Sequence, residues 1–295
     1  KAVAALRADG IPIEASTNRG YALSPAADLL HADGVTALLD PDVARALRIE
    51  VHDRLPGTNA ALRTRAAAGE AEGLVLIARA QSAGRGRNGR SFFSPPGGLY
   101  LSILLRPALG ARQAVQLTVM AAVAAARAAE SLCGAPIGIK WVNDLWKDNR
   151  KVCGILTEAS LDVESGLLDY AVVGPGFNVA PPPEGWPAEL QDIAGSLFST
   201  TPPPGTRARL AAEFLNAFWP LYRRSRLRDF LPDYRRRQVL PGRHVEVRPG
   251  RAAPYGATVM GVDEECRLVI RPDGQTALTA LGSGEVQILP ERKET

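Results

Sequence analysis

A glycine- and arginine-rich segment at residues 84–90, followed closely by two prolines and two glycines, most restricts the folds open to this 295-residue chain. Its letters, G-R-G-R-N-G-R, contain the G-x-G-x-x-G pattern of dinucleotide-binding turns. In those turns the glycines open a helix whose N-terminus meets a pyrophosphate. Here Pro95-Pro96-Gly97-Gly98 follows, which cannot form the body of a helix. The acidic residue expected for ribose binding is also missing, so the sequence argues against a Rossmann fold.

The same segment has the composition of an anion-binding loop. From residue 73 to residue 129 the chain contains no Asp or Glu but seven arginines. Three of these, Arg85, Arg87 and Arg90, lie in the segment itself, and an arginine keeps its charge at physiological pH. Glycine-rich turns also expose backbone N–H groups that can hold an anion. The sequence therefore predicts that this loop binds a phosphate, in a nucleotide or an acyl phosphate.

Length and composition restrict the remaining choices. The length is typical of about two domains. Lys and Arg exceed Asp and Glu by only 35 to 31, a bias compatible with nucleic-acid contact that does not establish it. We find no signal-peptide pattern and no apolar run as long as a membrane span, which predicts a cytoplasmic protein without a membrane partner. The scattered residues that we interpret as neither disulfides nor metal ligands are Cys133, Cys153, Cys266, His31, His52 and His244.

The order of predicted elements divides the chain into four parts. Residues 1–25 have the pattern of a helix end followed by a small hairpin, and a start in mid-helix implies a missing upstream part. Residues 26–47 are predicted to be linker helices. Residues 48–237 mix strands and helices without strict βαβ alternation, which favours an α+β domain around a mixed or antiparallel sheet. Residues 238–295 hold five short strands between Gly, Pro and Asp turns, the pattern of a small β-barrel.

Within 48–237 the apolar patterns predict individual elements. A long alanine-rich helix is expected at 113–132 and an amphipathic helix at 207–223. A turn is expected at 147–150, between two strands that we expect to pair. The predicted strands are 74–78, 99–105, 137–142, 151–158 and 168–173.

Three further strings accompany the arginine loop. Lys140-Trp141-Val142-Asn143-Asp144 puts a mobile cation beside amide and carboxylate groups, although a strand end followed by an Asx turn would look the same. Val173–Val179 is predicted to be a strand that ends in closely spaced glycines, where a ligand can approach the backbone. Thr58-Asn59 is typical of a helix N-cap whose side chains also suit a polar ligand. Each string has a purely structural alternative, but their joint occurrence favours function.

Together these strings resemble the biotin protein ligases. Gln81–Arg90 is similar to the adenylate-binding loop of that family, and residues 140–144 are similar to its K-W-P-N-D motif. Lys151–Glu158 resembles the strand that follows this motif, and Val173–Val179 resembles a G-I-G-I-N-type turn. The resemblance implies a class II synthetase-like α+β domain, an SH3-like C-terminal barrel and, in residues 1–25, part of a winged helix-turn-helix.

The resemblance also implies a reaction in two steps. The carboxylate of biotin attacks the α-phosphate of Mg·ATP to give biotinyl-5′-AMP, and a lysine of a biotin carboxyl carrier domain then takes the biotinyl group. The implied cofactors are ATP and Mg²⁺, with no protein ligand assigned to the metal. Catalytic roles would fall on Lys140, Arg85 and Arg87. Biotin binding would fall on Thr58, Asn59, Gln81, Gly84, Arg85, Arg87, Lys140 and Gly154, and adenylate binding on Arg87, Arg90, Phe92, Asn143, Lys151, Gly174 and Asn178.

Partners and alternatives follow from the same resemblance. Bifunctional members also repress biotin genes, so operator DNA is an expected partner, with Arg19 in the N-terminal hairpin as a phosphate contact. A homodimer is expected when the adenylate is bound. The alternatives are a lipoate-type ligase and a DNA-binding repressor without efficient ligase activity. A lipoate ligase is disfavoured because lipoate lacks the ureido group that Thr58 and Gln81 would bind.

Some positions depart from the family pattern. Gly57 stands where the family has serine before Thr-Asn, which predicts the loss of one hydrogen bond to biotin. Val142 replaces the proline of K-W-P-N-D, and Pro175 removes an N–H between two glycines. Trp186 is expected either to cap the adenine or to pack as an ordinary tryptophan. The arginines at 223–237 are expected either to attract an acidic carrier or to form a solvated helix face.

Overall fold

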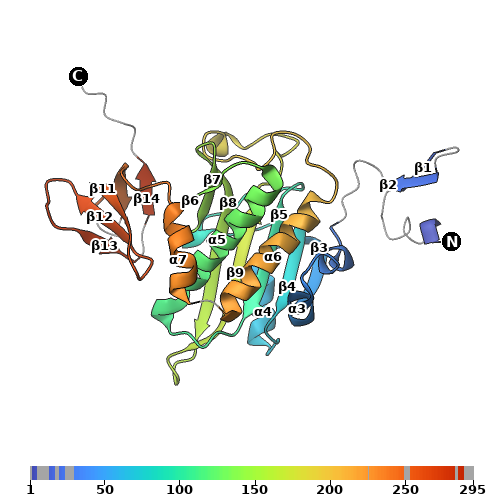
Figure 1. The fold of residues 1–295 in the computed structure, drawn as a ribbon, viewed down its shortest axis with the longest axis horizontal. Helices are drawn as coiled ribbons and strands as arrows, with labels where there is room; N and C mark the ends of the chain where they lie inside the picture. The colour runs from blue at the N-terminus through green and yellow to red at the C-terminus, as the bar shows by residue number, and fades with distance from the viewer. Residues whose placement is uncertain are drawn as a thin grey trace.

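A seven-stranded mixed sheet forms the centre of the computed structural model (Figure 1). The structure describes residues 2–4, 13–16, 20–23, 30–224, 226–248, 253–282 and 285–288. In spatial order the strands are β3 (Arg48–Leu55), β4 (Leu74–Gln81), β5 (Leu99–Leu105), β9 (Leu168–Phe177), β8 (Arg150–Leu161), β7 (Asp144–Lys147) and β6 (Gly138–Lys140). Strands β3 and β4 are parallel and all other neighbours are antiparallel, so the expected mixed α+β sheet is confirmed.

Helices cover both faces of this sheet. They are α4 (Thr58–Ala67), α5 (Ala114–Cys133), α6 (Thr206–Arg224) and α7 (Leu227–Arg236). Helices α5 and α6 pack across one face (Figure 1), and α4 packs across the other. Because side chains alternate along a strand, Val75 and Ile77 of β4 belong to the core under α5, whereas Leu74 and Leu76 pack under α4. A core on each face explains why β4 is continuously apolar.

Helix α5 is the buried centre of the larger core. Its residues from Leu117 to Ala129 are buried except for Arg127. Gly134 ends the helix with a φ of 65°, a left-handed conformation that suits glycine. Residues 111–133 contain a window of 18 residues with a mean hydropathy of 1.2, which by length and composition alone could cross a membrane, although Gln116, Thr118 and Arg127 interrupt its apolar residues. Within the protein, 67% of this segment's apolar window is buried, as in a core helix.

Residues 30–47, predicted to be linker helices, contribute to the core of the central unit. Helices α2 (Ala32–Thr36) and α3 (Pro41–Ala46) pack against α6. The side-chain amide of Asn216 in α6 accepts the N–H of Asp40 and donates to the carbonyl of Leu38, which fixes the connection between the two helices. Residues 24–29 lie outside the described residues.

One expected strand pairing near the β6 edge of the sheet is wrong, and one strand is longer than predicted. Strand β7 lies between β6 and β8, so the strands expected at 137–142 and 151–158 do not pair directly. Strand β9 continues past the predicted end at residue 173, through Gly174 and Gly176, and ends at Phe177 directly after these glycines. The turn between β7 and β8 does form where its sequence predicts it, through Asp148 and Asn149, both with positive φ.

The C-terminal part forms a separate antiparallel sheet in the order β13–β12–β11–β10–β14. Its strands are β10 (His244–Arg248), β11 (Tyr255–Val262), β12 (Leu268–Pro272), β13 (Thr279–Leu281) and β14 (Glu285–Ile288). The five expected short strands are therefore present. Within residues 244–248, 253–282 and 285–288 they form an open sheet with β13 and β14 at its edges, so the predicted closed barrel is not seen there.

At the other end, β1 (Ile13–Ser16) and β2 (Gly20–Leu23) form the expected antiparallel hairpin. Arg19, the predicted DNA contact, lies outside the described residues. The hairpin is compatible with the wing of a winged helix-turn-helix, and the rest of that motif stays a prediction.

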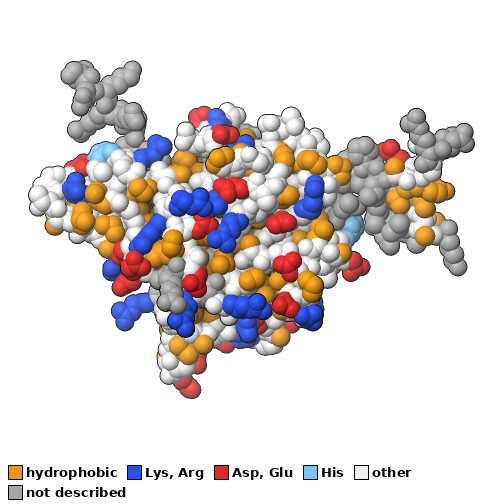
Figure 2. Space-filling view, in the orientation of Figure 1, with side chains coloured by type: hydrophobic (Ala, Val, Ile, Leu, Met, Phe, Trp, Pro, Cys, Tyr) orange, Lys and Arg blue, Asp and Glu red, His pale blue; other side chains and the backbone are white. Residues whose placement is uncertain are grey.

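The arginines at 223–237 do not form an uninterrupted basic face. Helices α6 and α7 carry them, and Figure 2 shows acidic side chains interspersed with basic ones over these helices. Five ion pairs between these arginines and acidic side chains favour a solvated helix face over a docking surface for an acidic carrier. The pairs are Arg223–Glu72, Arg224–Asp42, Arg235–Glu264, Arg236–Asp233 and Arg237–Asp233.

One of these arginines belongs to a buried cluster that joins α5, α7 and the sheet edge. The side chain of Arg237 is 7% exposed, and its guanidinium bonds to the two oxygens of Glu130 at 2.6 and 2.8 Å. Burial raises the pKa of Glu130, but the hydrogen bonds from Arg237 and the Ile137 N–H outweigh it and hold that pKa below its ordinary value. Burial also raises the pKa of Asp233, but the hydrogen bond from Arg127 and the charges of Arg237 and Arg127 outweigh it and hold that pKa below its ordinary value.

A carboxyl whose pKa is lowered by folding stabilises the protein above its ordinary pKa of about 4 and loses that contribution as the pH falls. We predict that Glu130→Gln lowers the free energy of unfolding by about 1–3 kcal/mol at pH 7, because Arg237 loses a charged partner. The difference from the unchanged protein should shrink as the pH falls below the ordinary carboxyl pKa of about 4, because Glu130 itself becomes protonated. Urea denaturation at a series of pH values measures both effects.

Glu264→Gln is the matched control for this prediction. The side chain of Glu264 is 80% exposed, so its pair with Arg235 should contribute less than about 1 kcal/mol. Equal losses in the two variants at pH 7 would contradict the importance of the buried cluster.

Candidate active site

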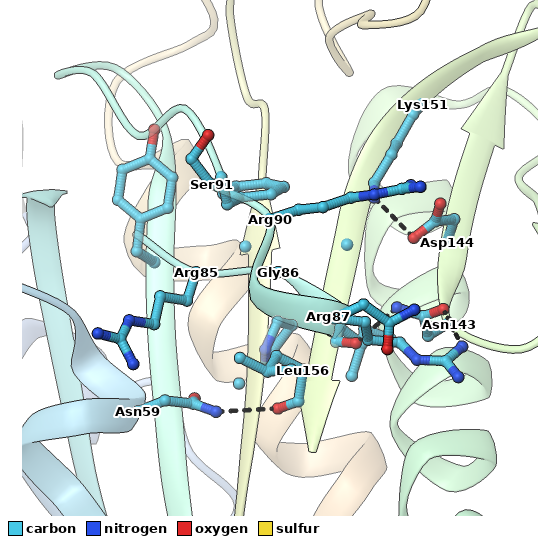
Figure 3. Close-up of a pocket in the computed structure, with 18 of the residues that line it drawn as sticks. Asn59, Arg85, Gly86, Arg87, Arg90, Ser91, Asn143, Asp144, Lys151 and Leu156 are labelled. Carbon is cyan, nitrogen blue, oxygen red and sulfur yellow. Dashed lines mark hydrogen bonds and ion pairs between the residues drawn. The ribbon is translucent and has the colours of Figure 1, made fainter. Parts of the chain in front are cut away.

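A cavity of about 510 Å³ lies on the α4 face of the central sheet, over strands β8 and β9 (Figure 3). Leu156 and Glu158 of β8 line it, whereas Thr157 points the other way and bonds to Thr118 of α5. Helix α4, the glycine-rich loop and the β6–β7 turn form its walls, and Arg248 and Gln287 reach it from the C-terminal sheet. Segments far apart in the chain therefore meet at one site.

One end of the cavity is closed by a network of uncharged hydrogen-bonding groups. The backbone N–H of Thr58 donates to Oε1 of Gln81 at 2.9 Å, and Nε2 of Gln81 donates to Oγ of Ser94 at 2.9 Å. Oγ of Ser102 on β5 lies 2.7 Å from Oγ1 of Thr58 and 2.6 Å from Oδ1 of Asn59. Thr58, Asn59 and Ser102 are 4%, 9% and 0% exposed, so protein groups rather than bulk water satisfy them.

The partners of Asn59 determine which groups of this network donate and which accept hydrogen bonds. Nδ2 of Asn59 faces two acceptors, the carbonyl of Leu156 at 3.2 Å and Oε2 of Glu158 at 3.0 Å, which fixes the orientation of the amide. Oδ1 of Asn59 cannot donate, so the single proton of Ser102 must go to it. Oγ1 of Thr58 lies 2.7 Å from Oγ of Ser102 and 3.3 Å from Oε1 of Gln81, and it keeps acceptor capacity for a ligand.

Missing side chains on β8 and β9 make room for this arrangement. A Cβ at Gly174 would lie 1.9 Å from Oδ1 of Asn59, and one at Gly176 would lie 2.8 Å from the ring of Phe92. A Cβ at Gly154 would lie 3.2 Å from the same ring. Gly154 and Gly176 are opposite each other across the strands, so they form a flat area of backbone, the glycine patch. Its bare surface is contacted here by protein side chains, and the predicted ligand contacts of Gly154 and Gly174 stay predictions.

The opposite end of the cavity carries positive charge. Nζ of Lys151 lies 2.7 Å from Oδ1 of Asp144 and 5.8 Å from the centre of the Phe92 ring. Nζ of Lys140 lies 5.1 Å from the centre of the Trp146 ring. Asp144 is opposite Lys140 across β6 and β7 and opposite the glycine patch across β7 and β8. Lys140, Asp144 and the glycine patch therefore lie side by side on neighbouring strands of the sheet.

The glycine-rich loop folds over this charged end. The N–H of Gly86 donates to the carbonyl of Arg90 at 2.7 Å, and Asn88 has a φ of 56° inside a short 3₁₀ turn. Nη1 of Arg87 donates to Oδ1 of Asn143 at 3.3 Å. The loop connects the antiparallel strands β4 and β5, and no helix follows it in the fully described segment 82–98. This geometry confirms the argument against a Rossmann fold.

The three loop arginines point in different directions. In Figure 3, Arg85 points toward Asn59, Arg87 toward Asn143, and Arg90 toward the ion pair of Lys151 with Asp144. Positive charge therefore reaches both ends of the cavity from above.

Most residues predicted for the site line this cavity. Gly84 does not: a Cβ there would lie 2.5 Å from the carbonyl of Phe92 and from Oγ of Ser94, so the bare position lets the loop pack. Asn178 does not line it either, because Nδ2 donates to the carbonyls of Lys151 and Gly195 at 3.3 and 3.0 Å. The residues that do line it are Thr58, Asn59, Gln81, Arg85, Arg87, Arg90, Phe92, Lys140, Asn143, Lys151, Gly154 and Gly174.

Other participants were not assigned from the sequence. Ser102 is the small polar residue of an otherwise bulky, buried strand, a signal that could have identified it. Glu158 bonds to Arg63 at 2.7 Å, and nothing in the local sequence relates these two residues. Thr58 is not the helix N-cap, which is Gly57 in an extended conformation. Gln81, from β4, takes over the capping role by accepting the N–H of Thr58.

The cysteines near the site are unsuited to nucleophilic chemistry. Burial raises the pKa of the Cys153 thiol well above its ordinary value, so it stays protonated beside the cavity wall. Cys133 and Cys266 are also free thiols. In the part of the chain that the structure describes, no three His, Cys, Asp or Glu side chains come together as metal ligands.

Comparisons with known proteins identify relatives of this chain. Residues 52–178 match the model of the biotin/lipoate A/B protein ligase family. The bifunctional ligase/repressor BirA of Bacillus subtilis is 33% identical over 233 residues, which cover 79% of this chain and 71% of that protein. The biotin–[acetyl-CoA-carboxylase] ligase of Paracoccus denitrificans is 33% identical over 221 residues, which cover 70% of this chain and 87% of that enzyme.

A solved structure has the same fold. The biotin protein ligase of Aquifex aeolicus, in complex with biotin and ATP, matches with a TM-score of 0.66 over 82% of this chain and 98% of its own, at 23% identity. The family match spans α4, the glycine-rich loop and the strands beneath the cavity, and the Bacillus subtilis relative extends the similarity beyond them. This chain therefore belongs to the biotin/lipoate A/B protein ligase family.

Proposed function

We propose that this protein joins biotin to a lysine of a carrier protein in two ATP-dependent steps. In the first, an oxygen of the biotin carboxylate attacks the α-phosphorus of ATP and pyrophosphate leaves, which gives biotinyl-5′-AMP. In the second, the uncharged ε-amine of the carrier lysine attacks the acyl carbon, AMP leaves, and the amine loses a proton. The observation that carries the proposal is a single cavity with a buried end of amide and hydroxyl groups, bordered by the Arg63–Glu158 ion pair, and a cationic end. Relatives named as biotin ligases support it.

The uncharged end of the cavity suits the cyclic urea of biotin. A ureido group has one carbonyl acceptor and two N–H donors, and burying it without partners would be costly. The hydroxyl of Thr58 and the amides of Asn59 and Gln81 offer groups of both kinds. Gly57 offers no side chain where the family has serine, so one hydrogen bond to biotin is expected to be missing. Lipoate has no ureido group, which favours biotin as the acid.

The cationic end suits a carboxylate and a phosphate that must meet. These anions repel each other, and cations already in place reduce that barrier. Lys151 lies between the glycine patch and Asp144, whereas Lys140 lies over Trp146. We therefore assign to Lys151 the position between carboxylate and α-phosphate that the family resemblance implies for Lys140. Arg85, Arg87 and Arg90 would add charge from the loop.

Asp144 fits a magnesium ion brought in with ATP. Mg²⁺ in nucleotide sites is held by one or two carboxylates together with substrate phosphates. Asp144 is a carboxylate of the cavity that lies directly beside the proposed phosphate-binding lysine. When bound, the ion would neutralise charge on the phosphates.

A contact between the loop and the proline-rich segment supports a cover over the adenylate. The rings of Phe93 and Trp186 meet edge to face with centroids 6.2 Å apart. Ile193, from the segment that follows Trp186, lines the cavity. Closure of the two segments would keep water away from the mixed anhydride.

The proposed protein partner is a biotin carboxyl carrier domain. Two copies of the chain are also expected to pair when the adenylate is bound, and β3, an edge strand of the central sheet, offers backbone groups for such pairing. The free thiols of Cys133, Cys153 and Cys266 favour a reducing compartment, which we take to be the cytoplasm.

The first prediction concerns the acid that is transferred. The intact mass of a carrier domain incubated with this protein and Mg·ATP should increase by one biotinyl group when biotin is present. Lipoate should give no increase, because it cannot use the ureido-binding end. A carrier whose acceptor lysine is replaced by arginine is the control. Modification with lipoate at a comparable rate would contradict the biotin assignment.

The second prediction concerns Ser102. Ser102→Ala removes the proton that Oδ1 of Asn59 accepts, and a lost hydrogen bond in a buried network costs about 1–1.5 kcal/mol. The Michaelis constant for biotin should therefore rise about tenfold, while that for ATP should change less than about twofold. Steady-state pyrophosphate release measures both. Ser131→Ala, on α5 across the sheet, is the matched control, and an equal rise for biotin and ATP would contradict a role at the biotin end.

We also propose a repressor role, in which the N-terminal hairpin belongs to a DNA-binding domain. The ligase/repressor BirA of Bacillus spizizenii is 28% identical over 98% of this chain, a match that includes the N-terminal hairpin. The protein should bind DNA upstream of its biotin genes in a salt-dependent manner. Arg19→Ala should reduce the slope of log affinity against log salt by about one, the effect of losing one phosphate contact. An unchanged slope would exclude Arg19 as that contact.

A further inference from the structure

The β6–β7 turn, residues 141–143, is more deeply buried than turns usually are. It joins Lys140 to Asp144, so residues of the cationic end of the cavity lie at both of its ends. Trp141 and Val142 are only 5% and 6% exposed, whereas connecting segments normally run over the surface. A buried turn needs partners for its backbone groups. Those partners come from distant parts of the chain.

Tyr234 of α7 supplies the contact at the middle of the turn. Its hydroxyl donates to the carbonyl of Val142 at 3.0 Å, and Tyr234 is 0% exposed. Burial raises the pKa of Tyr234 well above its ordinary value, so the hydroxyl keeps its proton at neutral pH and remains a donor. The turn is therefore tied to α7 by a bond that neither pH nor solvent readily breaks.

Other contacts hold the two ends of the turn. Nε1 of Trp141 donates to the carbonyl of Cys266, next to the C-terminal sheet, at 2.9 Å. Asn143 accepts the N–H of Ile155 at 2.9 Å and donates from Nδ2 to the carbonyl of Ile155 at 2.8 Å. Oδ1 of the Asn143 side chain accepts a hydrogen bond from Nη1 of Arg87. The turn thus links α7 and the C-terminal sheet to the glycine-rich loop.

Helix α7 is bonded to the C-terminal sheet as well as to the turn. Arg235, the neighbour of Tyr234, donates from Nε to the carbonyl of Val262 at 2.8 Å and forms an ion pair with Glu264 at 2.9 Å. Cys266, which accepts the indole bond, lies in the same connection between β11 and β12. The anchors of the turn are therefore also anchored to each other.

We propose that Tyr234 is a positioning residue for the formation of the adenylate. Tyr234 does not line the cavity, but the turn that it holds follows Lys140 and presents Asn143 to Arg87. This inference rests on the proposed ligase function and adds a residue outside the cavity to it. Without the hydroxyl, the carbonyl of Val142 loses its buried donor and the turn can shift. The uncharged end around Asn59 has no bond to this turn and should keep its geometry.

Tyr234→Phe tests the proposal because it removes the hydroxyl and keeps the ring. The turnover number of adenylate formation, measured by pyrophosphate release, should fall about 10- to 100-fold, the effect of a small misplacement of reacting groups. The Michaelis constant for biotin should stay within about twofold, since biotin recognition is at the other end. Biotinyl-AMP should leave the variant about tenfold faster, because Arg87 loses a well-placed acceptor.

Tyr222→Phe is the matched control. Tyr222 lies on α6, across the sheet from the cavity, and its hydroxyl bonds to Glu72. Each variant loses one phenol hydrogen bond, so similar decreases in melting temperature are expected. A kinetic change in Tyr234→Phe alone would support positioning. Unchanged pyrophosphate release in Tyr234→Phe, or the same loss in Tyr222→Phe, would overturn it.

Two further outcomes keep the test conclusive. If Tyr234→Phe does not fold, Trp141→Phe removes the indole N–H from the other anchor of the turn. That variant should show the same fall in turnover with an unchanged Michaelis constant for biotin, and full turnover would overturn the proposal. An unchanged protein that releases no pyrophosphate with biotin and ATP would instead refute the ligase function itself.

Discussion

The bare backbone of β8 and β9 is the constraint on which the site depends. Glycine weakens a strand because it packs nothing and loses more entropy on folding than other residues. Gly154, Gly174 and Gly176 nevertheless lie within these strands. A Cβ at Gly174 would collide with Asn59, one at Gly176 would collide with Phe92, and one at Gly154 would crowd Lys151 and Phe92. The sheet is stabilised from its other face, where α5 and α6 pack an extensive apolar core. A flat sheet can therefore carry a cavity without losing its own cohesion.

The glycine patch also separates two kinds of chemistry. Amides and hydroxyls can be buried when each finds a partner, and the network around Asn59 and Ser102 meets that condition. Burying charged guanidinium groups would be far more costly. Arg85 and Arg90 accordingly lie exposed on a loop and Arg87 is only partly buried, so their charge is brought over the cavity from above. The uncharged end is thus built into the fold, and much of the cationic end is carried by a connection between strands.

The sequence predicts the fold class and most cavity residues, but not how the residues contact each other. Helices α5 and α6 have clear periodic patterns and were expected within one residue of their observed ends. Strand β7 has only four residues and no apolar run, so its pattern does not predict a strand. The sequence also does not show whether Gly174 and Gly176 form a turn or make room for a side chain that packs on them. The bonds of Asn59 span 43 residues to Ser102 and 99 residues to Glu158, distances over which local patterns carry no information.

The two ends of the cavity also differ in what holds them. The bonds of Asn59 are made within the central sheet and α4, so these elements hold Asn59 at the end of the cavity that we propose for biotin. The turn after Lys140 depends in addition on α7 and on the carbonyl of Cys266 beside the C-terminal sheet. Arg248 and Gln287 of that sheet reach the same cavity. Under the proposed function, a displacement of the C-terminal sheet should therefore disturb the end proposed for the phosphate before the end proposed for biotin, and so affect adenylate formation more than biotin binding.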